Sequence, residues 1–469
     1  MSVVAVVPAR GGSKGIHRKN LRLLNGFPLI VHAIHHAQQA RLIDRVIVST
    51  EDEEIAHVAR NAGAEVPFLR PAELATDDAV DLGAFQHVLH YLKSEEGVVP
   101  ELLVQVRATS PVRRPVFLDL SVRRMRDRPE VDSLRSISTS AQTPYKMWHY
   151  TEDGLIDPVV RYAEVPDWFD MPRQALPPAF IQDGLVDVVR PRTVLELKTM
   201  AGEKLLGLFH AEPAIDVDDV EALTRAGASS IWDKPVSALR GDNLFAMGGE
   251  TGSEAVAVTT LPVLAEIGVD VDDVADAEIR ARAAGAGELV LRCDLDTSLS
   301  DTTLRSLSAL AKEANARRVM LPVRDSGDPR QVALGRRKEL RRIADYMTGQ
   351  GVELCLDWDL RPEVLYELLG IIGHASINVA ACVESCGALS VDELDDLELL
   401  AHRIGVLYVR DADSEPETWI SQMPLFLKRL SDGHFEGDIV MAAPRRRAVQ
   451  IDDRAGLLTS LLATSGVSN

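Results

Sequence analysis

The sequence has no uninterrupted apolar run of about 18 residues, the length at which a helix can cross a bilayer. It also lacks a basic N-terminal region followed by an apolar run, because an apolar strand pattern begins at Val3 and meets Arg10 soon afterwards. Such a region would be typical of a secretory signal peptide. We therefore expect no membrane-spanning helix, no export and a cytoplasmic location.

An excess of basic residues is also lacking. The 469 residues include 71 acidic and 51 basic side chains, which gives a formal net charge of −20. Nucleic acids and anionic membranes are bound through basic surfaces, so we expect neither as a partner. The length predicts about two to four domains with ample material for buried cores.

Cysteine is scarce, and no internal repeat of the solenoid kind is present. A structural zinc site needs four clustered Cys or His ligands, and the sequence offers no such cluster around the Cys382–Cys386 pair. We expect the cysteines to be small buried side chains in a reducing compartment. The four are Cys293, Cys355, Cys382 and Cys386, all in the C-terminal half.

The most informative stretch is at the N-terminus, where the apolar run Val3–Val7 predicts a buried parallel strand. The turn after it combines cations with glycines, which let backbone N–H groups approach a ligand closely. This pattern predicts a polyphosphate-binding loop, although a surface loop with solvated charges fits it as well. The spacing is not that of a P-loop, which argues against an ATPase or GTPase. The cations are Arg10, Lys14, Arg18 and Lys19, and the glycines are Gly11, Gly12 and Gly15.

The phrases PARGGSKGI (residues 8–16) and KNL (residues 19–21) resemble the signature of the CMP-sialic acid synthetase (acylneuraminate cytidylyltransferase) family. This resemblance implies an α/β fold with a doubly wound, mostly parallel sheet, and CTP as the nucleotide. The implied nucleotide-binding residues are Ala9, Arg10, Gly11, Gly12, Ser13, Lys14, Lys19, Asn20 and Asp77.

The next segments alternate between helix and strand, as βαβ units do. Helical periodicity covers residues 28–40, and the apolar residues 46–49 predict a strand. Ser49 or Thr50 is expected to cap the following helix, whose first turn is acidic.

A further core strand is expected over residues 102–106, followed by the polar residues of RATSP. Open α/β sheets bind ligands at the carboxyl ends of their strands. By resemblance, Gln105, Thr109 and Ser110 match the family's Gln-x-Thr-Ser-Pro motif, but with a shifted spacing. Either Gln105 or Arg107 can take the place of the glutamine that lies near the acceptor sugar. Thr109 and Ser110 are equally explained by turn chemistry.

Residues 144–159 predict a hairpin with its turn at 152–154. In relatives this region reaches into a partner subunit, so the resemblance implies a homodimer or higher homo-oligomer. Lys146, Arg173 and Gln174 are the implied partners of the acceptor's carboxylate. Asp187 stands where the family has an aromatic residue, which leaves the acceptor open: sialic acid, another keto-sugar acid or a phosphonate.

Asp216 and Asp218 flank Val217 in a segment that reads as extended, where they would share one face. Paired carboxylates of this kind suit Mg²⁺, which takes its remaining ligands from substrate phosphates. The family's Ile-Asp-Ile-Asp motif matches these positions and implies the same metal. The alternative is that they belong to the first turn of the next helix, with Asp218 as its N-cap.

The C-terminal half changes to short apolar strands separated by helical stretches. We expect a cytidylyltransferase domain over residues 1–228, a linker over 229–242 and a (β/α) TIM-barrel-like domain over 243–469. Seven of the eight strands that such a barrel needs are expected, at residues 244–247, 289–293, 319–323, 352–356, 377–383, 404–409 and 438–441.

Three phrases of this half, at residues 344–359, 378–389 and 404–413, resemble sugar phosphate isomerase/epimerase barrels. Asp357 and Glu384 match two of that family's metal ligands. The expected histidine is replaced by Gly387 or Tyr408, and the last glutamate by Ala442, so we expect no catalytic metal. The Asp294-Leu-Asp296 phrase superficially resembles a phosphatase nucleophile motif, but no matching lysine and acidic pair follows.

Together these observations predict a cytidylyltransferase that transfers CMP from CTP to a hydroxyl of a small acidic acceptor such as a nonulosonic acid. The expected catalytic residues are Arg10, Lys14, Lys19, Asp216 and Asp218, with Mg²⁺ on the two aspartates. The alternatives are a bifunctional enzyme whose barrel isomerises or epimerises a sugar, and a cytidylyltransferase for a non-sugar acid with a non-catalytic C-terminal module.

Overall fold

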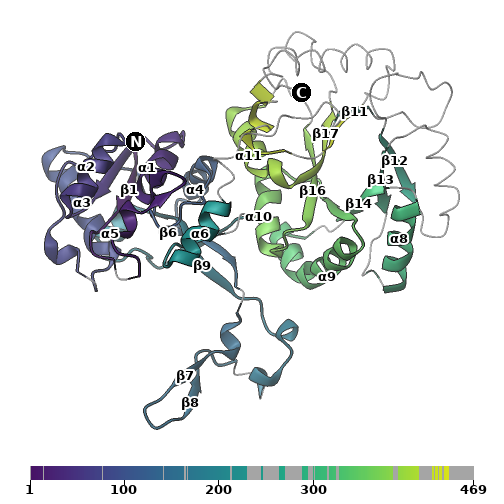
Figure 1. Ribbon diagram of the computed structural model, residues 1–469, viewed down its shortest axis with the longest axis horizontal. Coiled ribbons are helices and arrows are strands. Elements are labelled where there is room, and N and C mark those ends of the chain that lie inside the picture. The colour runs from purple at the N-terminus through teal and green to yellow at the C-terminus, as the bar shows by residue number, and fades with distance from the viewer. Residues whose placement is uncertain are drawn as a thin grey trace. The chain divides into compact units, whose positions relative to one another are not determined.

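The computed structural model divides the chain into two compact units, residues Met1–Pro235 and Val236–Asn469 (Figure 1). It describes residues 2–229, apart from 14, 77, 141, 163, 164, 166, 212 and 213. In the second unit it describes residues 244–246, 264–269, 288–293, 299, 301–313, 316–323, 327–383, 389–410, 425, 426, 428–430, 432–435 and 438–442. The predicted linker falls almost wholly outside these residues, so the predicted domain limits stay a prediction.

The first unit is built on a six-stranded sheet with the order β10-β6-β9-β5-β1-β4. Strand β9 runs antiparallel to both of its neighbours, and the other neighbouring pairs are parallel. The predicted mostly parallel α/β sheet is therefore confirmed. The strands are β1 (Val3–Pro8), β4 (Arg45–Ser49), β5 (Leu102–Gln105), β6 (Ser133–Thr139), β9 (Phe180–Val189) and β10 (Leu205–Phe209).

Helices connect these strands, and their ends follow from local capping. Helix α2 begins after Asp52, whose carboxylate accepts from the N–H groups of Glu54 and Ile55. The prediction of Ser49 or Thr50 as the cap was wrong, because Ser49 still belongs to β4 and Thr50 Oγ1 accepts from Asp52 N instead. The helices are α1 (Leu29–Gln39), α2 (Glu53–Asn61), α3 (Asp81–Glu95), α4 (Pro115–Asp127), α5 (Pro191–Leu195) and α6 (Val220–Ser229).

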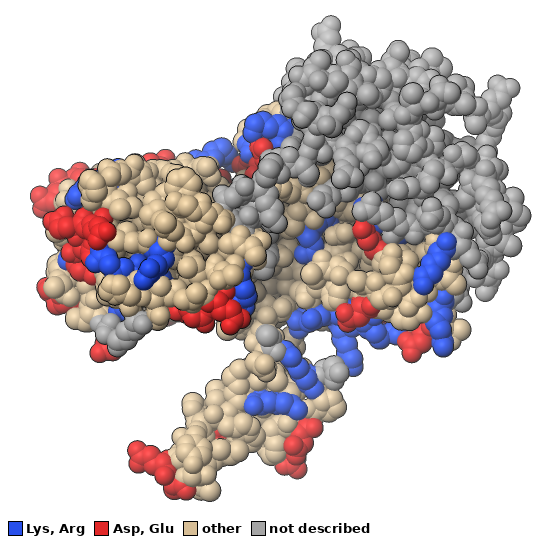
Figure 2. Space-filling model, viewed as in Figure 1, with Lys and Arg blue, Asp and Glu red and all other residues tan. Residues whose placement is uncertain are grey.

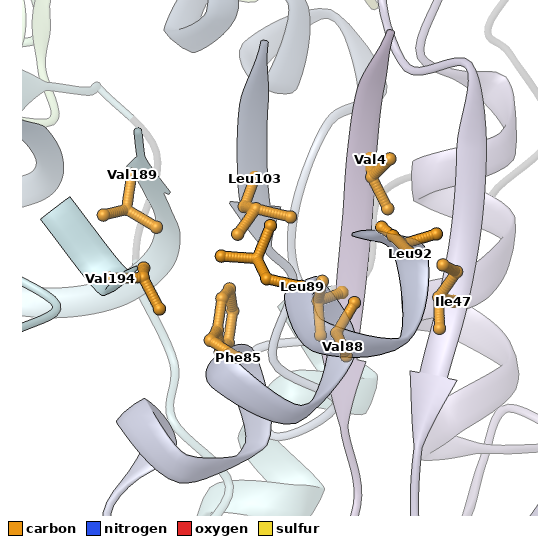
Figure 3. Close-up of a cluster of buried hydrophobic side chains, with 10 residues drawn as sticks. Val4, Ile47, Phe85, Val88, Leu89, Leu92, Leu103, Val189 and Val194 are labelled. Carbon is orange, nitrogen blue, oxygen red and sulfur yellow. The ribbon is translucent and has the colours of Figure 1, made fainter. Parts of the chain in front are cut away.

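Helix α3 covers one face of this sheet through a stripe of apolar side chains spaced three and four residues apart. Figure 3 shows the stripe against side chains from the strands, and the cluster is almost wholly buried. Burial of this kind contributes about 1.5–3 kcal/mol for each large side chain. The packing of α3 holds the strands of the sheet in register, and it thereby positions the loops that follow them. The labelled residues are Phe85, Val88, Leu89 and Leu92 of α3, with Val4, Ile47, Leu103, Val189 and Val194.

Residues 140–179 form an arm that leaves the sheet between β6 and β9 and extends away from it (Figure 1). Its hairpin joins β7 (Trp148–Tyr150) to β8 (Ile156–Pro158) through a turn in which Gly154 has φ +83°. The predicted hairpin and turn are confirmed. The arm also holds the short helices η3 (Pro144–Lys146), η4 (Trp168–Asp170) and η5 (Arg173–Ala175).

The second unit has an eight-stranded sheet in which every recorded pairing is parallel, with the order β11-β18-β17-β16-β15-β14-β13-β12. Each predicted strand has a counterpart, and the prediction missed β12 (Leu264–Val269). Strands β12 to β18 are neighbours in chain order, whereas β11 pairs with β18 at the other end of the series. The predicted closure into a barrel stays a prediction. The other strands are β11 (Leu244–Ala246), β13 (Glu288–Cys293), β14 (Ala316–Pro322), β15 (Glu353–Asp357), β16 (Ile377–Val383), β17 (Ile404–Arg410) and β18 (Asp438–Ala442).

Long helices lie between these strands in the chain: α8 (Asp301–Glu313), α9 (Pro329–Gly349), α10 (Pro362–Ile372) and α11 (Val391–Leu400). Cys355 is buried as expected, whereas Cys382 is only half-buried, so the expectation of burial was wrong for Cys382. Several residues singled out in this half, Asp294, Asp296, Glu384, Cys386 and Gly387, lie outside the described residues. Of the helices that are described, none combines the length and apolarity needed to cross a bilayer.

Candidate functional site

The loop after β1, residues 9–20, is here called the glycine loop. It starts at the carboxyl end of β1, where Ala9 N donates to Ser49 O of the neighbouring strand at 3.0 Å. Asn20 is buried and closes the loop, because its Nδ2 donates to Arg10 O at 2.9 Å. Arg18 precedes the helical turn η1 (Lys19–Leu21) with φ 53°, in the left-handed region. The loop is therefore held at both ends by the chain's own backbone.

The acidic segment, residues 214–219, leads into α6. Val217 is fully buried, whereas Asp216 and Asp218 on either side of it are exposed. The predicted placement of both aspartates on one face of an extended segment fits this alternation. The cap of α6 is Asp219, whose Oδ1 accepts from Ala222 N at 2.7 Å, so the alternative role of Asp218 as the N-cap is wrong.

The glycine loop and the acidic segment lie against each other. Lys19 Nζ is 2.8 Å from Asp218 Oδ1, across 199 residues of sequence. A Cβ on Gly15 would lie 2.3 Å from Asp218 O, so only glycine fits there. Ile16 and Val217 share one buried cluster, which fixes the contact through apolar packing.

Carboxylates at the start of α2 face the other side of the loop. Gly11 N donates to Glu51 Oε1 at 2.7 Å, and Glu51 Oε2 accepts from Arg70 at 2.9 Å. Arg18 pairs with Asp52 at 2.9 Å and with Glu54 at 2.8 Å. Burial opposes ionisation of Asp52, but the bonds from Ile55 N and Arg18 outweigh it and lower its pKa. Sequence reasoning missed these contacts, because it assigned the acidic run only to the helix dipole.

The carboxyl end of β5 carries a second polar cluster. Gln105 is 2% exposed and donates to Asp81 Oδ2 at 2.7 Å. The Arg107 side chain is 35% exposed, and its Nη2 lies 3.2 Å from both Asp81 Oδ2 and Asp187 Oδ2. The sequence left open whether Gln105 or Arg107 stands near the acceptor. Arg107 is the accessible one of the two.

Asp187 is itself buried, and β9 places it between β5 and β6. Its carboxylate also meets Arg135 Nε at 3.7 Å and Gln182 Nε2 at 3.2 Å. Burial lowers the pKa of Arg135, against the attraction of Asp187. The residue that replaces an aromatic side chain is thus the centre of a buried ion-pair network.

Arg113 lies beneath this cluster and is fully buried. Its Nε donates to Leu185 O and its Nη2 donates to Arg107 O at 3.1 Å. Burial, together with the nearby charge of Arg107, lowers the pKa of Arg113 to about 9. The backbone of the 107–110 loop therefore rests on a guanidinium that the sequence gave no reason to single out.

The same loop reaches the acidic segment, because Val217 N donates to Thr109 O at 2.7 Å. The glycine loop, the acidic segment and the end of β5 are therefore joined in one place within the first unit. Among the side chains that the structure describes, no group of three or more His, Cys, Asp or Glu residues is arranged to hold a metal ion. Asp216 and Asp218 offer two carboxylates, and a hard cation there would need further ligands from a substrate.

The remaining predicted site residues lie apart from this place or outside the described residues. Lys146 and Arg173 belong to the arm, where Arg173 donates to Ser140 O at 3.0 Å. Gln174 is in η5, but its side chain is not among those described, and neither Lys14 nor Asp77 is described at all. Arg10 reaches Thr76 O at 2.9 Å, Gly12 is exposed and Ser13 is half-buried.

Comparison with known proteins supports the resemblance in the first unit. Residues 4–151 match the family model described as cytidylyltransferase. The chain is 40% identical over 115 residues to a CMP-N,N'-diacetyllegionaminic acid synthase of Legionella pneumophila, which covers 24% of this chain and 49% of the relative. It is 37% identical over 112 residues to a pseudaminic acid cytidylyltransferase of Campylobacter jejuni, which covers 24% of this chain and 48% of the relative.

The chain thus spans about half the length of the curated relatives it matches. A solved CMP:2-keto-3-deoxy-manno-octonic acid synthetase in complex with CTP aligns with 49% of this chain and 98% of its own, at 15% identity and a TM-score of 0.36. The family match confirms that residues 4–151 resemble the cytidylyltransferases, and it leaves the barrel resemblance of the C-terminal half untested.

Proposed function

We propose that this protein is a cytidylyltransferase that transfers CMP from CTP to a hydroxyl of a small acidic acceptor of the nonulosonic acid class. The observation that carries the proposal is the contact between Lys19 of the glycine loop and Asp218 of the acidic segment. It joins a cation from a phosphate-type loop to one of two exposed carboxylates. The names of the matched relatives supply the acceptor class.

The donor set at Asp216 and Asp218 fits Mg²⁺. Both side chains are exposed, with the buried Val217 between them, and oxygen ligands are those that this ion prefers. When bound, Mg²⁺ supplies positive charge to the phosphates on which negative charge grows. With Asp218 neutralised in this way, Lys19 would be available to a phosphate oxygen.

The chain's own groups do the positioning. In the reaction the acceptor oxygen forms a bond to the α-phosphorus of CTP, the bond to the β-phosphate breaks, and pyrophosphate leaves with the electron pair. The hydroxyl proton passes to solvent. Arg10, Lys14 and Lys19 hold the leaving pyrophosphate, and N–H groups of the glycine loop face phosphate oxygens. No covalent intermediate is needed, because orientation and charge stabilisation account for phosphoryl transfer.

The experiment is a pyrophosphate-release assay with the full chain, CTP, Mg²⁺ and a panel of legionaminic, pseudaminic and N-acylneuraminic acids. We expect release with at least one acid and none without an acid. Failure to release pyrophosphate with every acid, in a chain that binds CTP, would contradict the proposed reaction, and failure to bind CTP would contradict the proposed nucleotide.

A homodimer formed through the arm is part of the proposal. The arm hairpin exposes large apolar side chains: Tyr150 is 80%, Leu155 64% and Ile156 54% exposed. Figure 2 shows uncharged residues over much of the arm, with basic residues near its base and acidic residues at its tip and on one side. Exposed apolar surface of this kind is typical of an interface. By the same proposal Lys146, Arg173 and Gln174 contact an acceptor only once the arm has a partner.

For the second unit, we propose a closed TIM-barrel-like domain that serves as a binding or assembly module rather than as a metal-dependent isomerase. The support is the strand order: β12 to β18 follow the chain, and β11 pairs with β18, as the first and last strands of a (β/α)₈ barrel do. A cytoplasmic location also belongs to the proposal, because the nucleoside triphosphate it requires is made inside cells.

A further inference from the structure

The Arg107 cluster, which consists of Arg107, Asp81, Gln105, Ser110 and Asp187, points to a role within the proposed reaction. We propose that Arg107, rather than the arm residues Lys146, Arg173 and Gln174 that the resemblance implies, binds the carboxylate of the acceptor acid. Asp187 positions its guanidinium from inside the sheet. Asp81 is the resident partner that the carboxylate replaces. The inference rests on the proposed function, and it identifies Arg107 as the residue that favours an acid over an uncharged acceptor.

The two carboxylates on Arg107 differ in accessibility. The Asp187 side chain is 3% exposed and that of Asp81 is 36% exposed, although both lie 3.2 Å from Arg107 Nη2. Asp187 is fixed by its place in β9 and by its contacts with Gln182 and Arg135. It therefore holds Arg107 permanently, as an anchored counter-ion.

Asp81 has the opposite character. It begins α3, and its pair with Arg107 is open to solvent on both sides, where such pairs contribute little to stability. Gln105 donates to Asp81 Oδ2 at 2.7 Å, so this carboxylate keeps a partner after it leaves Arg107. Exchange of Asp81 for a substrate carboxylate therefore leaves no buried charge unpaired.

Donors without acceptors provide the second, independent observation. Among the described side chains, Arg107 Nε, Ser110 Oγ and Arg113 Nη1 are buried and have no hydrogen-bond partner. The first two are each 3.6 Å from the point that a Cβ on Gly184 would occupy. Buried donors normally find acceptors, so this surplus indicates that a ligand oxygen or an ordered water belongs here.

The position suits the chemistry. The cluster is at the carboxyl end of β5, which is the parallel neighbour of β1, and the glycine loop leaves β1 at the same edge. Through Thr109 O and Val217 N the cluster is also bonded to the acidic segment. An acid bound to Arg107 is thereby held beside the proposed triphosphate site. A guanidinium can grip a carboxylate with two parallel hydrogen bonds, which a lysine cannot do.

The test compares an accepted acid with its methyl ester, which keeps the attacking hydroxyl and loses the charge. For the wild-type chain we expect kcat/KM to favour the acid by about 10- to 100-fold, the range for a charge-assisted pair. In R107M we expect KM for the acid to rise by a similar factor, KM for CTP to stay unchanged, and the preference over the ester to disappear. The control is R128M, at an exposed arginine that pairs with Glu130 on the surface.

Asp187→Asn tests positioning. It keeps the shape of the side chain, and we expect a raised KM for the acid and a weaker preference over the ester at unchanged CTP affinity. A loss of CTP affinity in parallel would mean that Asp187 is only structural.

If R107M keeps the wild-type preference while releasing pyrophosphate, the role of Arg107 is overturned and the proposed function stands. If the wild-type chain binds CTP but releases no pyrophosphate with any acid, the proposed function and this inference both fail.

Discussion

Lys19 and Asp218 form an ion pair of 2.8 Å between Nζ and Oδ1, although 199 residues separate them in the sequence. The pair connects the loop after the first strand with the segment before α6. A cation bound at Asp218 would compete with Lys19 for the negative charge of this carboxylate. The metal would therefore both neutralise the acidic segment and release a cation for the phosphates.

Replacing Asp218 by asparagine is expected to lower pyrophosphate release by about 100-fold or more, because several kcal/mol of charge stabilisation depends on the bound cation. The free energy of unfolding should change by less than about 1 kcal/mol, because Asp218 is 75% exposed and its ion pair with Lys19 lies at the surface. Steady-state assays over a range of Mg²⁺ concentrations, with thermal melting alongside, measure both effects. The control is Asp127→Asn, at an exposed position at the end of α4. Equal activity of the two variants would contradict the assigned role.

Gly15→Ala tests the close approach between the loop and the acidic segment. Its Cβ would lie 2.3 Å from Asp218 O, so the loop must move, at a cost of about 1–3 kcal/mol. For a domain of this size the melting temperature should fall by about 2–10 °C. Gly12→Ala is the matched control for stability, because nothing lies within 4 Å of its added Cβ. Identical melting temperatures for both variants would show that the loop does not pack against Asp218 in solution.

A buried pair predicts how stability depends on pH. Burial opposes ionisation of Asp183, but hydrogen bonding and charge from His210, at 2.6 Å, and a bond from Ser136 outweigh it and lower its pKa. A carboxylate whose pKa is lowered by folding contributes stability above its unfolded pKa of about 3.9. This contribution is lost as the pH falls through the folded value.

Asp183→Asn should therefore destabilise the first unit by about 1–3 kcal/mol at pH 7 and by less at pH 3. Differential scanning calorimetry of the full chain measures this, and the relevant transition is the one that CTP shifts upward. If Asp183→Asn lowers the free energy of unfolding by the same amount at both pH values, the lost stability does not come from the ionised Asp183–His210 pair.

The arm is expected to hold two copies of the chain together. Ile156→Glu places a charge on its exposed apolar surface and should convert a dimer to a monomer in light scattering after gel filtration. Val99→Glu is the matched control, because Val99 is 53% and Ile156 54% exposed. A dimer that persists in Ile156→Glu would place the interface elsewhere.

Local patterns predicted much of the fold. The apolar run at residues 3–7 and the helical periodicity of residues 28–40 correspond to β1 and α1 with shifts of one residue. Strand β12 (Leu264–Val269) was missed, because LAEIGV is interrupted by a charge and a glycine. Both capping assignments were wrong by one to three residues, since several adjacent polar side chains can each serve as a cap.

Contacts between distant residues were harder to predict. The bond from Gly11 N to Glu51 spans 40 residues, and nothing in the acidic run distinguishes Glu51 from its neighbours. The choice between Gln105 and Arg107 depended on where the strand ends, because β5 is buried on both faces up to Gln105 and Arg107 lies beyond it. The meeting of Lys19 and Asp218 could be expected only because both patterns call for the same triphosphate.

A crystal structure of the full chain with CTP and Mn²⁺ in place of Mg²⁺ tests the central claim most directly, because anomalous scattering locates the metal. The account predicts a metal peak bonded to the carboxylates of Asp216 and Asp218 and to the triphosphate, with Lys19 moved from Asp218 to a phosphate oxygen. A nucleotide bound elsewhere, or a Lys19–Asp218 pair that stays intact beside bound CTP, would contradict it.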